Sequence, residues 1–106
     1  MQAGGRMEIS DEKLQELIGQ WHEEGRGQFE ASYPGLDYDS PSYRKRFVRK
    51  ARYVCLDDGD SGAFVVDQTD GNVYRIKSKY GVPNRKKLVG NIDGIRGRQL
   101  HRSRWW

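Results

Sequence analysis

The sequence predicts a small α+β domain: an antiparallel meander of three to four strands, an N-terminal amphipathic helix packed on one face, and a second short basic helix. Two observations indicate this fold class. Residues 53–79 alternate short apolar runs with glycine-containing turns, and Asp70-Gly71 between two such runs is a strong hairpin signal because glycine adopts positive φ without strain. Residues 14–21 place apolar side chains at the i, i+3, i+4, i+7 spacing of one helical stripe.

The N-terminal helix is expected over about residues 11–24. Ser10 is a good N-cap, and Asp11 and Glu12 suit the positive end of the helix dipole. Gly25 is expected to end the helix. The apolar stripe is expected to be core, with Leu14, Leu17, Ile18 and Trp21 packed against Phe64, Val66, Tyr74 or Ile76 of the sheet.

The next segments are less regular. Residues 25–40 are expected to form a connection that contains aromatic anchors. A helix over about 41–50 is favoured because Pro41 suits the first helical position. The alternative is one long strand from Arg46, with Phe47, Arg49, Ala51 and Tyr53 on one side. Strands are expected at 53–56, 63–66 and 73–77, with a short fourth strand at 88–92.

At 106 residues the chain has the size of one domain. We expect a flexible N-terminus over 1–9, a single α+β domain over 10–95, and a mobile basic Arg/Trp tail over 96–106. The sequence has neither an apolar run long enough to span a bilayer nor an N-terminal apolar signal segment, so no membrane association is expected. The single cysteine, Cys55, is expected to be a buried thiol, and a reducing cytoplasm, of a cell or an infected host, is the expected compartment.

No motif predicts catalysis, a metal or a cofactor. Residues 59–62 match the GDSG tetrapeptide of chymotrypsin-like proteases, but that chemistry needs a His base and an Asp on a much larger scaffold. The acidic turn from Asp57 does not have the ligand spacing of an EF-hand. Glycine-rich phosphate-binding motifs are absent from the sequence. We therefore expect a protein that is not an enzyme.

Charge is divided unevenly along the chain. Residues 1–40 carry a net −6 and residues 41–106 a net +10. In residues 43–53, cations alternate with aromatic rings, a composition that suits phosphates and unpaired bases. The predicted nucleic-acid-binding residues are Arg44, Lys45, Arg46, Arg49, Lys50, Arg52, Arg75, Lys77, Lys79, Arg85, Lys86, Lys87, Arg98, Arg102, Arg104, Trp105 and Trp106.

The leading functional prediction is a binding module for nucleic acid, either single-stranded DNA or RNA. The alternative is a protein-interaction module or inhibitor that binds an acidic or nucleic-acid-handling host or defence protein. The small size, hairpin-centred plan and mixed charge look like those of short open reading frames of phages and other mobile elements. A third reading is that the basic part faces only the acidic N-terminal helix and solvent.

Overall fold

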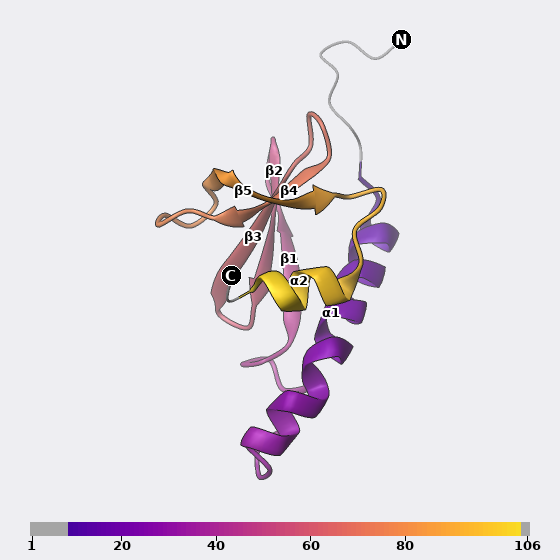
Figure 1. Cartoon of the computed structure of the whole chain (residues 1–106), viewed down its shortest axis with the longest axis vertical. Helices are drawn as coiled ribbons and strands as arrows, with labels where there is room; N and C mark the ends of the chain where they lie inside the picture. Colours follow the sequence, from indigo (N-terminus) through magenta and orange to yellow (C-terminus); the bar gives the residue numbers. More distant parts are fainter. Residues whose placement is uncertain (1–8, 105–106) are drawn as a thin grey trace.

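The computed structural model describes residues 9–104, which form one long helix, a five-stranded antiparallel sheet and a short C-terminal helix (Figure 1). The strands lie side by side in chain order, a simple meander. The α+β class and the antiparallel meander are confirmed, with one strand more than the upper limit of the prediction. The elements are α1 (Asp11–Ser32), β1 (Lys45–Arg49), β2 (Tyr53–Asp58), β3 (Ser61–Asp67), β4 (Asn72–Ile76), β5 (Pro83–Asn91) and α2 (Gly97–Ser103).

The N-terminal end of α1 is fixed as predicted. The Ser10 hydroxyl oxygen accepts a hydrogen bond from the Lys13 amide at 3.1 Å, which caps the helix. The Arg49 guanidinium on β1 donates to the Ile9 carbonyl at 2.6 Å and to the Asp11 carboxylate at 2.7 Å. Ile9 is itself buried, whereas the rest of the expected flexible N-terminus lies outside the described residues.

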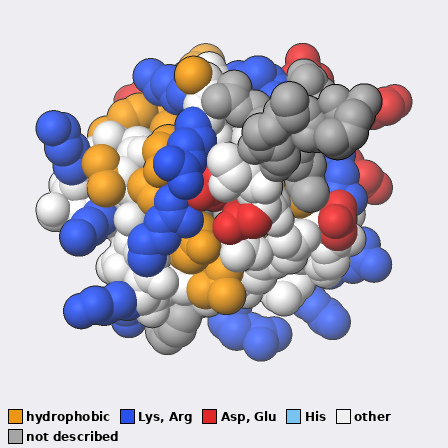
Figure 2. All heavy atoms as spheres, turned by 90° about the horizontal axis from the view of Figure 1, so that it is seen from above, with side chains coloured by type: hydrophobic (Ala, Val, Ile, Leu, Met, Phe, Trp, Pro, Cys, Tyr) orange, Lys and Arg blue, Asp and Glu red, His pale blue; other side chains and the backbone are white. Residues whose placement is uncertain are grey.

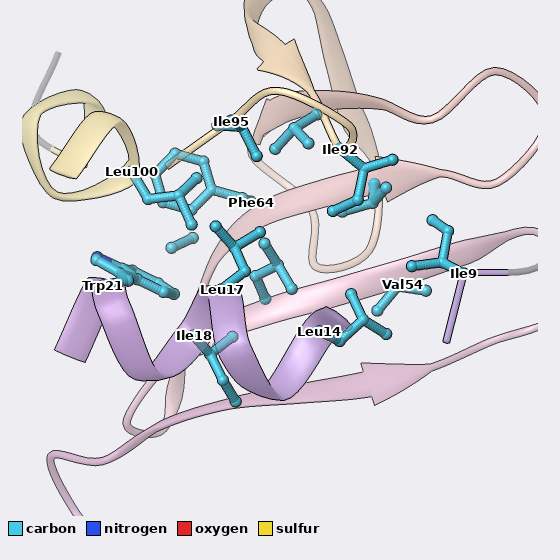
Figure 3. Packing of buried hydrophobic residues seen from close by; sticks show 14 residues of the cluster. Ile9, Leu14, Leu17, Ile18, Trp21, Val54, Phe64, Ile92, Ile95 and Leu100 are labelled. Carbon is cyan, nitrogen blue, oxygen red and sulfur yellow. The ribbon is translucent and has the colours of Figure 1, made fainter. Parts of the chain in front are cut away.

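The apolar stripe of α1 packs on the sheet as predicted (Figure 3). Trp21 is fully buried, and its ring meets the Phe64 ring edge to face at a centroid distance of 5.3 Å. Val66 also belongs to this core. Tyr74 does not, because it pairs with Val65, and side chains of neighbouring positions point to opposite faces of a sheet.

The predicted end of α1 at Gly25 is wrong, since the helix continues to Ser32. The extension is supported by tertiary packing: the Phe29 ring lies 4.7 Å from both the Tyr38 and the Tyr43 rings, centroid to centroid. These two partners come from the connection after the helix. The glycine at position 25 does not predict contacts between distant residues. Tertiary packing of this kind commonly overrides the low helix propensity of a glycine.

The favoured helix over residues 41–50 is also wrong. A turn leads into β1, so the segment is a strand, but the alternative of one long strand from Arg46 through Tyr53 is also wrong because the chain turns between β1 and β2. Phe47 pairs with Leu56 and Val48 with Cys55, which gives this segment a full antiparallel ladder with β2. The strand stops at Arg49 because the chain turns back into β2. The expected fourth strand at 88–92 is the fifth in the sheet and begins earlier, at Pro83.

The C-terminal region is not a mobile tail over its whole length. Residues 97–103 form α2, whose Leu100 is fully buried near Trp21 (Figure 3). α2 approaches α1 closely because Gly97 has no side chain: a Cβ there would overlap the Trp21 backbone nitrogen. The Gly97 amide donates to the Gln20 side-chain oxygen at 3.1 Å. Trp105 and Trp106 lie outside the described residues.

Replacing Trp21 with Ala is expected to abolish cooperative unfolding. Removing a buried Trp costs ~3–5 kcal/mol, a large share of the ~5–15 kcal/mol that stabilises a typical domain. Urea denaturation followed by circular dichroism measures this effect. Glu24→Ala, an exposed change on the same helix, should unfold like wild type. An unchanged midpoint for Trp21→Ala would refute this description of the core.

Replacing Leu100 with Ala is expected to destabilise the protein by ~2–5 kcal/mol, because it opens a cavity between α2 and α1. The exposed change Arg98→Ala on the same helix is the matched control. Thermal melts compare the two variants. If both melt at the wild-type temperature, α2 does not contribute to the core.

Candidate nucleic-acid interface

The basic stretch at residues 43–53 does not form an open cationic face. Lys45 is only 8% exposed, and its ammonium lies 3.2 Å from the Asp58 carboxylate and donates to the Tyr38 hydroxyl at 2.9 Å. Arg46 pairs with Asp60 at 2.9 Å. Lys45 is therefore removed from the predicted interface because its side chain is buried, and the charge of Arg46 is already balanced.

A buried carboxylate holds two further cations of the predicted set. Asp67 accepts hydrogen bonds from Arg85 at 2.8 Å and from Arg52 at 3.2 Å, and the Thr69 hydroxyl donates to it at 2.7 Å. Burial alone would raise the pKa of Asp67, but the hydrogen bonds from Thr69, Arg85 and Arg52 hold it well below the ordinary 3.8. The Asp67 cluster, made of Asp67, Thr69, Arg52 and Arg85, joins β5 to β3 and to the β1–β2 turn.

Three tyrosines near this cluster each carry a cation over the ring. Guanidinium and ammonium groups are attracted to the negative face of an aromatic ring. One face of each ring is therefore occupied by a cation of the chain itself. The pairs are Arg52 over Tyr53 at 5.2 Å, Arg85 over Tyr74 at 4.8 Å, and Lys50 over Tyr80 at 5.9 Å.

The β4–β5 hairpin, residues 72–91, contains six cations and no acidic residue. Two of these cations have partners in the fold, since Arg85 binds Asp67 and Arg75 donates to the Arg104 carbonyl at 3.1 Å. Three lysines are exposed, and their ammonium groups have no acidic partner among residues 9–104. These are Lys77, Lys79 and Lys86, which we call the hairpin lysines; Lys87 follows them on β5 and makes contacts of its own.

The loop of this hairpin is tied back to the sheet. The Tyr80 hydroxyl donates to the Asp57 carboxylate at 3.0 Å, and Gly81 adopts a φ of 80°, which only glycine takes easily. Burial, followed by the Asp57 hydrogen bond, raises the pKa of Tyr80. Lys77 and Lys79 therefore belong to a loop with a defined position, and Lys86 lies on β5.

The hairpin and the acidic helix lie on different sides of the molecule. In Figure 1 the β4–β5 connection projects away from the sheet on the side opposite α1. Figure 2 shows Lys and Arg side chains around an apolar strip on the left, whereas most of the visible Asp and Glu side chains lie toward the centre and right. Within residues 9–104, Arg49–Asp11 is the salt bridge that joins α1 to the sheet. The connection of the β4–β5 hairpin therefore does not face the acidic helix.

Arg44, Arg98, Arg102 and Arg104 lie outside the β4–β5 hairpin, although the Arg104 carbonyl accepts the hydrogen bond from Arg75 on β4. Arg44 donates to the Asp39 carbonyl at 3.3 Å, and the Arg104 guanidinium lies 3.2 Å from Asp58. Arg98 and Arg102 are exposed on α2, which packs against α1. The predicted interface thus divides into separate regions, and the hairpin is the part in which cations gather without acids.

Cys55 and His22, whose side chains carry nucleophilic or metal-ligating atoms, are held inside the fold. Cys55 is fully buried as predicted, and burial raises the pKa of its thiol. Burial lowers the pKa of His22, which stacks on Tyr38 and binds Asp39. Residues 9–104 contain no cluster of three metal-ligating side chains, and no helix there is long and apolar enough to cross a membrane.

Comparison of the chain with protein-family models, with curated proteins and with solved structures found no match. The geometry of the described residues is therefore the basis for any functional argument. The hairpin cations are predicted individually from the sequence, but the prediction did not recognise that they share one acid-free hairpin. The signal was available in the sequence, as the absence of Asp and Glu between Asp70 and Asp93.

Replacing Asp67 with Asn is expected to destabilise the protein because two arginines lose their shared carboxylate. A carboxyl with a lowered pKa contributes stability above its ordinary pKa of 3.8 and loses it as pH falls through the lower folded value. The stability difference between wild type and Asp67→Asn should therefore be full at pH 5–7 and shrink below about pH 4. Urea titrations across this range measure it, with the exposed change Asp60→Asn as the control. A difference that does not depend on pH would contradict the lowered pKa.

Proposed function

We propose that the protein is a non-enzymatic module that binds single-stranded nucleic acid, RNA or DNA, through the β4–β5 hairpin. The observation that carries this proposal is the acid-free run of six cations on one hairpin, projecting on the side opposite the acidic helix. Clustered cations attract the phosphate backbone, and release of counterions drives binding. The acidic helix would orient the molecule so that the hairpin meets the polyanion first.

The hairpin offers two kinds of contact. The hairpin lysines are flexible point charges suited to phosphates, and they carry no sequence information. Arg52 and Arg85 are about half-exposed and are held in place by Asp67, so their planes are positioned to stack on bases. This combination supports salt-sensitive binding with little preference for sequence.

A protein with an acidic surface is the second candidate partner. The observation that favours it is that Tyr80 and Leu88 on the same hairpin are 48% and 50% exposed. An aromatic and an aliphatic side chain beside lysines could provide the apolar centre that protein interfaces use. An inhibitor of a nucleic-acid-handling protein would use this same surface.

The salt dependence of binding tests the leading proposal. Fluorescence anisotropy with a labelled 20-nucleotide single strand, as RNA and as DNA, should give log K against log salt slopes of about −3 to −6 for wild type. Replacing the three hairpin lysines with Gln should weaken binding and make the slope shallower by about 2, since each phosphate contact contributes about 0.7. Leu88→Ala should leave nucleic-acid binding nearly unchanged.

The matched control is the triple variant Arg44→Gln, Arg98→Gln, Arg102→Gln, which loses the same net charge at exposed positions outside the hairpin. If both triple variants lose the same affinity, the net charge of the protein rather than the hairpin is responsible for nucleic-acid binding. No binding of either strand at low salt would refute the nucleic-acid proposal. Loss of a protein partner on Leu88→Ala would then support the second candidate.

A further inference from the structure

The turn between β1 and β2, residues 50–52, lies beside the β4–β5 hairpin, although the two segments are far apart in the chain. The Lys50 ammonium lies over the Tyr80 ring in the hairpin connection at 5.9 Å. The Arg85 guanidinium on β5 donates to the hydroxyl of Tyr53, the residue directly after the turn, at 3.2 Å. The fold therefore brings two basic segments together, and only one of them belongs to the hairpin.

These two segments meet on the face of the sheet that α1 does not cover. Val54 and Leu56 of β2 belong to the core beneath α1, so Tyr53 and Cys55, which alternate with them, point to the other face. A Cβ at Gly81 would lie 3.8 Å from the Cys55 sulfur, which places the hairpin connection over that face. A ligand that reaches the connection from this side therefore meets the turn as well.

The acids of this surface lie beneath its cations. The Asp67 side chain is buried and already holds Arg52 and Arg85, whose own side chains are about half-exposed. Asp57 is also buried and accepts a hydrogen bond from the Tyr80 hydroxyl at 3.0 Å. Solvent therefore meets the cations of this surface before it meets the carboxylates that balance part of their charge.

Lys50 adds a cation that no acid neutralises. It is exposed, and its ammonium has no carboxylate within ion-pair distance in residues 9–104. Its contact is with the face of the Tyr80 ring, and a contact of this kind at an exposed site contributes only ~0.5–1 kcal/mol and leaves the positive charge in place. Lys50 differs in this respect from Lys45 and Arg46, whose charges are paired with Asp58 and Asp60.

A buried amide fixes the position of the turn. The Gln68 side-chain nitrogen donates to the Lys50 carbonyl at 3.3 Å and to the Ala51 carbonyl at 3.4 Å, and its oxygen accepts from Arg49 at 3.0 Å. The Gln68 backbone amide donates to the Arg52 carbonyl at 2.9 Å. A turn held in this way has little backbone freedom left to lose when a ligand binds, which favours binding.

We propose that the β1–β2 turn and the β4–β5 hairpin form one continuous track for a single strand of nucleic acid, in which Lys50 is a phosphate contact. This inference rests on the proposed function and adds a second segment to its site. Six cations make up the track, and even with Asp57 and Asp67 ionised they leave it strongly positive. They are Lys50, Arg52, Lys77, Lys79, Arg85 and Lys86.

Fluorescence anisotropy with the same labelled 20-nucleotide strand tests the role of Lys50. Lys50→Gln should weaken binding roughly fivefold to tenfold at 50 mM salt and make the log K against log salt slope shallower by about 0.7, the contribution of one phosphate contact. Lys50→Arg, which keeps the charge, should bind like wild type. Lys13→Gln removes the same charge from an exposed lysine on α1 and is the matched control, which should also bind like wild type.

The hairpin-lysine triple variant separates a failure of this inference from a failure of the proposed function. If the triple variant loses affinity but Lys50→Gln binds like Lys13→Gln, the hairpin acts alone and the track is wrong. If wild type does not bind the strand at low salt, both the proposed function and the track fail, and an acidic protein becomes the candidate occupant of this surface.

Nuclear magnetic resonance gives a readout that a change of net charge does not imitate. Titration of the ¹⁵N-labelled protein with the unlabelled strand should shift the backbone amides of residues 50–53 and of residues 77–82 with the same apparent Kd. The amides of residues 11–24 on α1 should stay in place. Shifts confined to residues 72–91, with residues 50–53 unmoved at saturation, would overturn the inference.

Discussion

The packing around Trp21 is the contact on which the rest of the structure depends. Its ring meets Phe64 on the sheet at 5.3 Å, and the Lys45 ammonium lies over it at 5.2 Å. Its backbone lies against Gly97 at the start of α2. One buried residue thus joins both helices and the sheet. Because the domain is small, no second core could replace this contact.

Pairing decides which cations are available to a ligand. The basic character of the chain is spread over many residues, but buried or fixed acids bind several of them: Asp58 holds Lys45 and Arg104, and Asp67 holds Arg52. These pairs order the framework. Three exposed lysines, Lys77, Lys79 and Lys86, lie where the sequence has no acid, on the β4–β5 hairpin.

The sequence by itself determined the features that depend on neighbouring residues. The start of α1 follows from the Ser10 cap, and the burial of its stripe follows from apolar spacing. The β2–β4 meander follows from its turns, where Gly59 and Gly71 adopt φ values of 63° and 79°. These turns need a positive φ, which glycine adopts without strain and other residues rarely do, so a pattern of a few residues is sufficient to predict them. The hairpin cations were also identifiable, since exposed charge on a hairpin needs no distant partner.

Only the tertiary structure decided the features that depend on residues far apart in the chain. α1 continues past Gly25 because Phe29 packs against the Tyr38 and Tyr43 rings, and residues 97–103 become a helix because Leu100 has a buried place near Trp21. The same holds for Lys45: its sequence neighbours are basic, yet a distant carboxylate and two rings draw it into the interior. Burial and pairing depend on which residues the fold brings together in space. The spacing of residues along the chain does not predict those partners.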